Sequence, residues 1–173
     1  AGVQKLVNQQ QEPPEMLYLT WMGMAAKIQQ KNEIINKQCI ELQKRLDGDG
    51  YRNYIMKGQS NAALYGDLQM LRQSGDIDIY LEGGLEKVLA YAKTFGDVEH
   101  VNELEMRVPV YQDTEVEFHY RPFIMRNPFK NAKLQAYFKS CEETNFSNSL
   151  ILDKQNKLAI CAPTMEFNLV HQL

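Results

Sequence analysis

Acidic residues suited to holding a metal ion stand in two short alternating segments of the sequence. Asp76 and Asp78 belong to the run Asp-Ile-Asp-Ile-Tyr-Leu, and Glu117 belongs to the run Glu-Val-Glu-Phe-His-Tyr. Residues two apart on a β-strand point to the same face, so Asp76 and Asp78 are expected side by side. Their charges repel unless a cation or a proton lies between them, and carboxylates are the ligands that bind Mg²⁺. A strand with one face in solvent would show the same alternation. This motif alone is therefore also consistent with aspartates that simply face water.

A short polar turn precedes these acids in the chain. It runs from Lys57 to Ser60, between a strand predicted over residues 51–57 and a helix predicted over residues 61–71. Glycine lets a backbone approach a ligand closely, and amides at the start of a helix favour anions. The alternative is that Ser60 simply caps a helix. The turn nevertheless predicts phosphate or nucleotide contacts from Gly58, Gln59, Ser60, Lys57 and, after the predicted helix, Arg72.

Three carboxylates next to a phosphate-binding turn are what two-metal phosphoryl transfer requires. One ion activates the attacking oxygen, and the other holds the triphosphate and the leaving group. Glu115 faces the same side of its strand as Glu117, and periodicity alone does not separate the two. His119 shares that face, and Arg121 follows it, so both are predicted as accessory residues of the site.

The elements that must position these residues follow from hydrophobic periodicity. A helix is predicted over Glu15 to Leu46, because Ile28, Ile35, Cys39, Leu42 and Leu46 form one apolar stripe. The run Asp47-Gly48-Asp49-Gly50 should end it, since glycine accepts the left-handed conformation of a helix end. This run is not a calcium loop, because Tyr51 stands where the next ligand would be.

The rest of the chain alternates between strands and helices. The pattern predicts strands over residues 76–81, 98–104, 107–111 and 115–120, a helix after Gly83-Gly84, and a helix from Pro128 to about Glu143. A hairpin is expected from residues 149–152 and 158–161, followed by a helix from Pro163 that runs to the end. A helix that stops without a cap suggests that the native chain continues further.

Composition limits the class of protein. The chain has 173 residues, 44% of them hydrophobic and 24% charged, with a net charge of −3. These values are typical of globular proteins and argue against a broad nucleic-acid-binding surface. Neither a signal segment nor an apolar run of about 20 residues is present, so we expect a cytoplasmic protein without a membrane partner. Three scattered cysteines predict buried free thiols rather than disulfides or a zinc site.

The combined motifs resemble the nucleotidyltransferase superfamily typified by DNA polymerase β. They are similar in more detail to a bacterial group of largely uncharacterised nucleotidyltransferases, through the strings Met56-Lys57-Gly58-Gln59-Ser60, Arg72-Gln73-Ser74-Gly75-Asp76-Ile77-Asp78-Ile79 and Glu115-Val116-Glu117-Phe118-His119-Tyr120-Arg121-Pro122. The resemblance extends from about Lys27 to the C-terminus. In that group the third acid precedes an apolar residue and a histidine, which selects Glu117 over Glu115. One departure is Gln59, which displaces Ser60 by one position from the usual glycine–serine turn.

The resemblance implies a fold, a reaction and a cofactor. The fold would be α+β (α/β-like), with a mixed sheet flanked by helices and an N-terminal helical segment before it. Residues 1–50 would form a lead-in and this segment, and residues 51–173 a core that is truncated at the C-terminus. Asp76, Asp78 and Glu117 would hold two Mg²⁺ ions, or Mn²⁺, and an NTP such as ATP would donate a nucleoside monophosphate to an unknown acceptor. A non-catalytic nucleotide-binding scaffold is the main alternative, and a metal-dependent phosphohydrolase or nuclease is a third.

Overall fold

The computed structural model describes residues 13–153 and 157–172. The predicted lead-in therefore lies mostly outside the described residues. The predicted α+β fold with a mixed sheet is confirmed. The elements follow in the order α2 (Glu15–Gly48), β1 (Asn53–Met56), α3 (Lys57–Ala62), 3-10 helix η1 (Ala63–Leu71), β2 (Asp76–Leu81), α4 (Gly84–Ala92), β3 (Glu105–Arg107), β4 (Glu115–His119), α5 (Pro128–Ser147), β5 (Ser149–Asp153), β6 (Leu158–Cys161) and α6 (Met165–Gln172).

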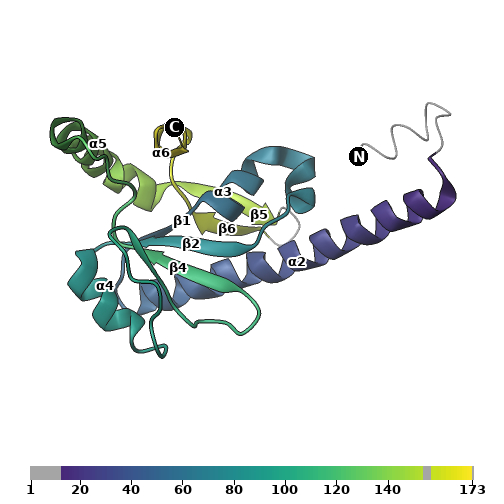
Figure 1. Cartoon of the computed structure of the whole chain (residues 1–173), viewed down its shortest axis with the longest axis horizontal. Coiled ribbons are helices and arrows are strands. Elements are labelled where there is room, and N and C mark those ends of the chain that lie inside the picture. Colours follow the sequence, from purple (N-terminus) through teal and green to yellow (C-terminus); the bar gives the residue numbers. More distant parts are fainter. Residues whose placement is uncertain (1–12, 154–156, 173) are drawn as a thin grey trace.

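Helix α2 has 34 residues and is therefore about 50 Å long. The predicted stripe packs in its C-terminal half, where Ile35, Cys39 and Leu46 are fully buried. Its N-terminal half extends past the sheet (Figure 1). Leu17 and Met24 are exposed there, at spacings that continue the same apolar face. The helix ends close to the predicted residue, and Gly50 takes a φ of 81° just beyond it. The main hydrophobic core contains residues from both the predicted N-terminal segment (1–50) and the predicted core segment (51–173). A domain division at residue 50 remains a prediction.

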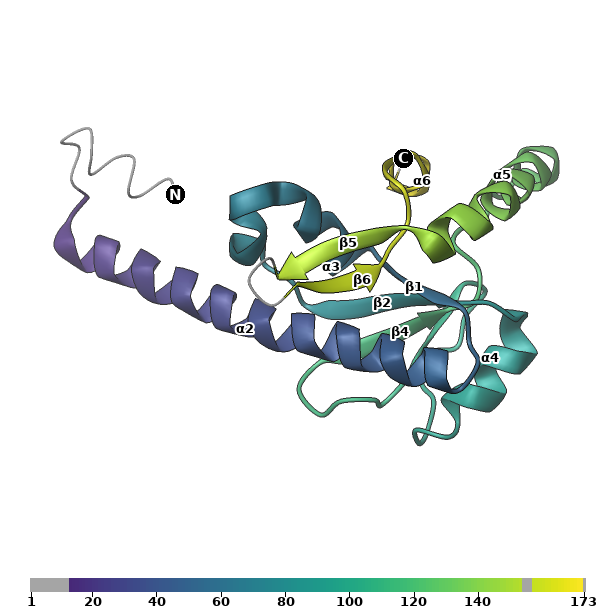
Figure 2. The same cartoon turned by 180° about the vertical axis from the view of Figure 1, so that it is seen from behind.

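The main sheet has the strand order β1-β2-β4-β3. Strand β2 pairs with β1 in antiparallel fashion and with β4 in parallel fashion, and β3 pairs antiparallel with β4. The two strands that carry the predicted acids are therefore direct neighbours at the centre of the sheet. Figure 2 shows α2 running along one side of this sheet, with α5 and α6 above the other.

The two faces of the sheet have different chemistry. One face is apolar, with Ile77, Ile79 and Phe118 buried against α2 and α4. On the other face, Tyr54 and Tyr80 pack with Phe138 of α5 and Phe167 of α6. The same face carries Asp76, Asp78, Glu115, Glu117 and His119, because side chains alternate along β2 and β4. The aromatic side chains thus cover one end of this face. They do not cover the part of the face that carries the acids.

Several predicted elements differ from the structure. The predicted strand over 98–104 is wrong, since Glu99 forms only an isolated bridge with Arg107. The strand predicted over 107–111 is instead β3, which ends at Arg107 before Pro109, a residue that lacks the N–H needed in a ladder. The helix predicted over 61–71 begins at Lys57 and changes into η1, where Gly66 takes a non-helical φ of 58°.

The C-terminal part follows the predictions more closely. The hairpin of β5 and β6 is present, although residues 154–156 of its predicted turn lie outside the described residues. Asn127 caps α5 by accepting a hydrogen bond from the backbone N–H of Lys130. The three cysteines are free thiols, of which Cys39 is buried and the other two are partly buried. Among the described helices none is long and apolar enough to span a membrane.

Candidate active site

Asp78 and Glu117 are paired across the centre of the sheet. They are register partners on the parallel strands β2 and β4, so their side chains rise from neighbouring positions on one face. The side chain of Asp78 is only 4% exposed and that of Glu117 is 19% exposed. Buried carboxylates are retained when charges or hydrogen bonds compensate their desolvation. The parallel pairing of β2 with β4 brings these two acids together, and strand alternation places both on the same face.

His119 lies close to both acids and can compensate their charge. Its Nε2 atom lies 2.9 Å from Oδ1 of Asp78 and 3.9 Å from Oε2 of Glu117. The ring is buried, and its Nδ1 atom has no hydrogen-bond partner among the residues that the structure describes. The imidazole can therefore orient Asp78 by donating a hydrogen bond, or offer nitrogen to a metal ion after losing that proton.

Glu105 is a member of this cluster that the sequence analysis missed. It lies on β3 as the register partner of His119, and its Oε2 atom is 3.2 Å from Nε2 of that ring. The predicted strands ended at Leu104 and restarted at Arg107, so Glu105 fell into a presumed connection. The alternation Glu-Met-Arg, with Met106 buried between two partly exposed residues, is the signal that could have revealed it.

Lys57 supplies a cation to the same carboxylate. Its Nζ atom lies 2.8 Å from Oδ1 of Asp78, at the junction of β1 and α3. The residue has a φ of 43°, a left-handed conformation that is uncommon for a residue other than glycine. Such backbone conformations persist where the surrounding structure holds them, and they concentrate at functional sites. Lys57 thus lies beside Asp78, and its predicted contact with nucleotide stays a prediction.

The charges of this cluster shift the pKa values of its members in opposite directions. Burial alone would raise the pKa of Asp78, but the hydrogen bond and charge of His119 and the charge of Lys57 bring that pKa below its ordinary value. Burial and the nearby charges of Glu105 and Asp78 raise the pKa of Glu117. The pKa of Lys57 is lowered by burial, yet Asp78 raises it above its ordinary value overall. Asp78 is thus held ionised, while Glu117 binds a proton more readily than an isolated glutamate.

Asp78, Glu117 and His119 are close enough to share one metal ion. One potential ligand atom from each lies within 4.8 Å of the others. Two carboxylates suit Mg²⁺ or Mn²⁺, whereas an imidazole ligand is less typical of Mg²⁺. The donor set therefore fits a divalent cation held by the carboxylates, with His119 orienting Asp78 or serving as a further ligand.

Asp76 and Glu115 form the next pair along the same face. Glu115 makes an ion pair with Arg107 of β3, so its charge is already compensated. Glu117, by contrast, has the acids Asp78 and Glu105 as close neighbours. The geometry therefore separates the two glutamates that periodicity left equivalent. Asp76 lies two residues from Asp78, beside the three clustered ligands, in a position from which it could contact a second ion.

The predicted phosphate-binding turn directs the side chains of Gln59 and Ser60 into the protein interior. Ser60 is fully buried and donates its hydroxyl hydrogen to the backbone carbonyl of Lys57 at 2.8 Å. Gln59 points behind the turn, where it donates to Asn36 and accepts a hydrogen bond of 2.6 Å from Ser74. Both side chains therefore stabilise the turn. Gly58 is itself buried, and a Cβ atom there would lie 3.5 Å from the backbone oxygen of Asp76.

Among the described residues, no hydrogen bond or ion pair joins the two predicted arginines to the acidic cluster. Arg72 is partly exposed and hydrogen-bonds Ser74 at 3.1 Å, while Arg121 is exposed two residues beyond His119. Helix α6 adds His171, which sequence reasoning also missed. Its Nε2 atom lies 3.0 Å from the carbonyl oxygen of Pro122, and burial lowers its pKa. Only the folded chain places this residue near the site, because some fifty residues separate it from His119.

Comparison with known proteins identifies a family for this chain. Residues 3–171 match the model of a family described as uncharacterised nucleotidyltransferase. No curated protein and no solved structure matched the chain. The match covers nearly the whole sequence, including every element that carries the acidic cluster. The chain therefore belongs to this family of uncharacterised nucleotidyltransferases.

Proposed function

We propose that this protein transfers a nucleoside monophosphate from an NTP to an acceptor hydroxyl and releases pyrophosphate. The observation that carries the proposal is the pairing of Asp78 with Glu117 beside Lys57. ATP is the expected donor, Mg²⁺ the expected ion with Mn²⁺ as an alternative, and the cytoplasm the expected location. Membership of the family supports nucleotidyl transfer in general.

The proposed reaction divides its tasks among a few residues. Divalent cations bound by Asp76, Asp78 and Glu117 would neutralise the phosphoryl oxygens and acidify the attacking hydroxyl. The acceptor oxygen forms a bond to the α-phosphorus, and the bond to the bridging oxygen of the pyrophosphate breaks. Glu117 would receive the hydroxyl proton, whose release the bound cations favour by lowering the pKa of the hydroxyl.

Positioning of the triphosphate would fall to the end of β1. Lys57 can exchange its contact with Asp78 for a phosphate oxygen once cations compensate that acid. Helix α3 spans only six residues, and its dipole therefore contributes little.

One observation favours the alternative of a non-catalytic nucleotide-binding scaffold. The hydroxyl of Ser60 is used within the turn, whereas the nucleotidyltransferase pattern expects a serine to contact phosphate. A scaffold would bind NTP with the same acids and would not release pyrophosphate. Detection of pyrophosphate separates the two functions.

Isothermal titration of ATP and the other NTPs, with and without Mg²⁺, tests the proposal. We expect Mg²⁺-dependent binding by the natural protein and its loss in the Asp76→Asn/Asp78→Asn double variant. Glu86→Gln removes one exposed charge on α4 and serves as a control. Full nucleotide binding and turnover by the double variant would refute the assigned site. Binding without pyrophosphate release across a broad set of acceptors would favour the scaffold.

A further inference from the structure

His119 lies between two acids that come from the strands on either side of it. Strand β4 has β2 on one side and β3 on the other, so its side chains can contact residues of both. The Nε2 atom of His119 lies 2.9 Å from Oδ1 of Asp78 on β2 and 3.2 Å from Oε2 of Glu105 on β3. The ring is only 1% exposed, so water has little access to it. One buried nitrogen atom therefore has two carboxylates within hydrogen-bonding distance.

These two contacts determine which nitrogen of the ring carries a proton. An unprotonated Nε2 would direct its lone pair at two carboxylate oxygens, and electrostatic repulsion opposes that arrangement. A protonated Nε2 can donate to Asp78 at the present distance of 2.9 Å. The Nδ1 atom has no hydrogen-bond partner among the residues that the structure describes, so a proton placed there would be a buried donor without an acceptor. The neutral ring therefore has its proton on Nε2.

This proton separates the two roles that are open to His119. A histidine binds a metal ion through a nitrogen that carries a lone pair, and a protonated Nε2 has none. As long as Nε2 keeps its proton, the three clustered residues offer a cation only the carboxylate oxygens of Asp78 and Glu117. Oxygen ligands suit Mg²⁺ and Mn²⁺, whereas imidazole favours ions such as Zn²⁺. The position of one proton therefore affects which metal ion the site selects.

Glu105 provides what His119 needs to keep this proton. A cation at Asp78 draws on the carboxylate electrons that accept the hydrogen bond of His119. Without a second acceptor, Nε2 would become a buried donor beside a cation, which favours loss of the proton and direct ligation. Oε2 of Glu105 lies 3.2 Å from the same nitrogen and can replace Asp78 as acceptor. The other oxygen of Glu105 accepts a hydrogen bond of 3.4 Å from Asn102, which leaves Oε2 for His119.

We propose that Glu105 is a positioning residue of the active site. It accepts the hydrogen bond of the His119 Nε2–H group when a cation engages Asp78, and it thereby keeps His119 a hydrogen-bond donor instead of a metal ligand. The proton stays on Nε2 throughout, and only its acceptor changes. The inference rests on the proposed function, because that function requires a cation at Asp78 and Glu117.

Nuclear magnetic resonance of the histidine ring nitrogens tests this role, with Mg²⁺ as the added ligand. The chain has three histidines, so His100→Gln and His171→Gln variants identify the signals of His119. At mildly alkaline pH we expect Nε2 to be protonated and Nδ1 unprotonated, both without metal and after saturation with Mg²⁺. The signal of the Nε2 proton should shift as its acceptor changes from Asp78 to Glu105. Loss of this proton on Mg²⁺ binding, or no response to Mg²⁺, would overturn the proposal.

Two variants of Glu105 separate hydrogen bonding from charge. Glu105→Ala and Glu105→Gln both remove the negative charge, but only glutamine keeps an oxygen atom that can accept from Nε2. After Mg²⁺ binds, the signal of the Nε2 proton should remain in Glu105→Gln and disappear in Glu105→Ala, where no acceptor is left. The affinity for Zn²⁺ relative to Mn²⁺ should rise about tenfold or more in Glu105→Ala, because the released imidazole joins the ligands, and stay within about twofold in Glu105→Gln.

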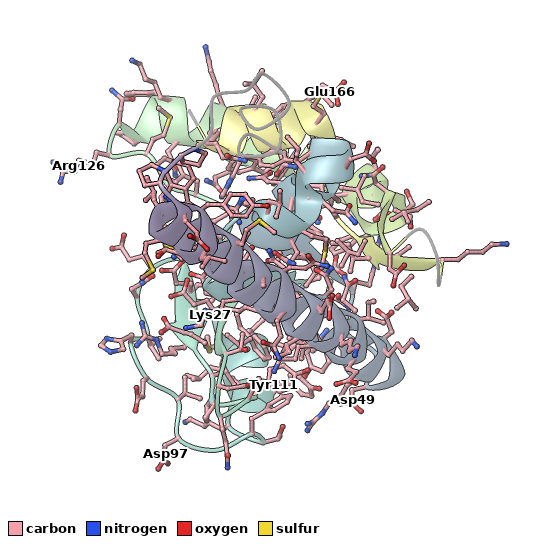
Figure 3. The ribbon with its side chains drawn as sticks, turned by 90° about the vertical axis from the view of Figure 1, so that its right-hand side faces the viewer. Lys27, Asp49, Asp97, Tyr111, Arg126 and Glu166 are labelled. Carbon is pink, nitrogen blue, oxygen red and sulfur yellow. The ribbon has the colours of Figure 1, made fainter. Side chains whose placement is uncertain are left out.

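An acid far from the cluster provides the matched control. Glu166 is exposed on α6 at the edge of the molecule, as Figure 3 shows. Glu166→Ala should leave the His119 signals and the ratio of Zn²⁺ to Mn²⁺ affinity as they are in the natural protein. Identical behaviour of Glu105→Ala and Glu105→Gln would show that only the charge of Glu105 matters, and the proposal would be overturned.

The outcomes also distinguish this inference from nucleotidyl transfer itself. If the two Glu105 variants differ as expected but no NTP supports pyrophosphate release, the proposed reaction fails while the role of Glu105 stands. If pyrophosphate is released but Mg²⁺ removes the Nε2 proton in the natural protein, the reaction stands and the role of Glu105 fails.

Discussion

The ammonium group of Lys57 lies 2.8 Å from Oδ1 of Asp78, the same carboxylate oxygen that His119 contacts. A cationic side chain thus lies beside an acid that we expect to bind metal. In the free protein Lys57 stabilises Asp78 in its ionised form, and it must compete with a divalent cation for that oxygen. Its left-handed backbone conformation shows that this placement is held against an intrinsic preference.

Replacing Lys57 with methionine should change metal and nucleotide binding in opposite directions. Without the competing ammonium we expect Mn²⁺ alone to bind more tightly, by about threefold or more. Mg²⁺–ATP should bind about tenfold more weakly, a loss of roughly 1.4 kcal/mol, because a charged phosphate contact disappears. Electron paramagnetic resonance of free Mn²⁺ and calorimetry with ATP measure the two effects. The exposed Lys27→Met variant on α2 is the control, and a parallel weakening of both ligands would contradict the competition.

The two glutamates of β4 should differ in metal binding although periodicity makes them equivalent. Glu117→Gln should weaken Mn²⁺ by about tenfold or more, since one charged ligand is lost at a cost of at least roughly 1.4 kcal/mol. Glu115→Gln should keep Mn²⁺ affinity within about twofold, because Glu115 is paired with Arg107 outside the cluster. Titration of Mn²⁺ without nucleotide compares them, and the reverse order would show that the wrong glutamate has been assigned.

Glu117→Gln should also stabilise the metal-free protein at neutral pH. Burial and two neighbouring acids raise the pKa of Glu117, so its charge disfavours the folded state. We expect a gain of about 0.5–2 kcal/mol in the free energy of unfolding, as is common when a strained functional site is relieved. The natural protein binds this proton more tightly when folded, so the gain should shrink as the pH falls through the raised pKa. Urea denaturation with chelator at neutral and acidic pH measures the difference in the free energy of unfolding between the variant and the natural protein. A stabilisation that increases as the pH falls would contradict the prediction.

Glu105→Gln should move the pH dependence of metal binding. The charge of Glu105 helps to raise the pKa of Glu117, and its removal should lower that pKa. Mn²⁺ binding requires ionised Glu117, so the variant should retain binding to a lower pH than the natural protein. Glu103→Gln removes an exposed acid from the same segment and should leave the midpoint unchanged. A midpoint that stays in place in Glu105→Gln would exclude this electrostatic link.

Gln59→Ala should destabilise the fold while leaving metal binding intact. Its side chain bonds Asn36 of α2 and Ser74 before β2, and its loss leaves buried polar groups without partners. The expected cost is about 1–3 kcal/mol in the free energy of unfolding. Gln73→Ala, at an exposed position nearby, should cost far less. A variant of full stability that no longer binds Mn²⁺ would place Gln59 in the site instead of behind it.

Local sequence patterns were sufficient for much of this fold. The apolar stripe of α2, the alternation of β2 and β4 and the capped start of α5 each depend on neighbouring residues, and each appears close to the predicted range. The short edge strand β3 was misjudged because Pro109 and the bridge at Glu99 limit pairing in ways that hydrophobicity does not reveal. The change from α3 to η1 likewise depends on packing against α2.

The candidate acids Asp76, Asp78 and Glu117, and the strand face expected for each, follow from the amino-acid sequence alone, because strand alternation is a local property. How these acids combine depends on the folded chain. Parallel pairing of β2 with β4 joined Asp78 to Glu117, and β3 brought Glu105 against His119. The ion pair with Arg107 set Glu115 apart, and the hydrogen bonds of Gln59 turned it away from the site. These outcomes depend on contacts between residues far apart in the chain, which no local periodicity encodes.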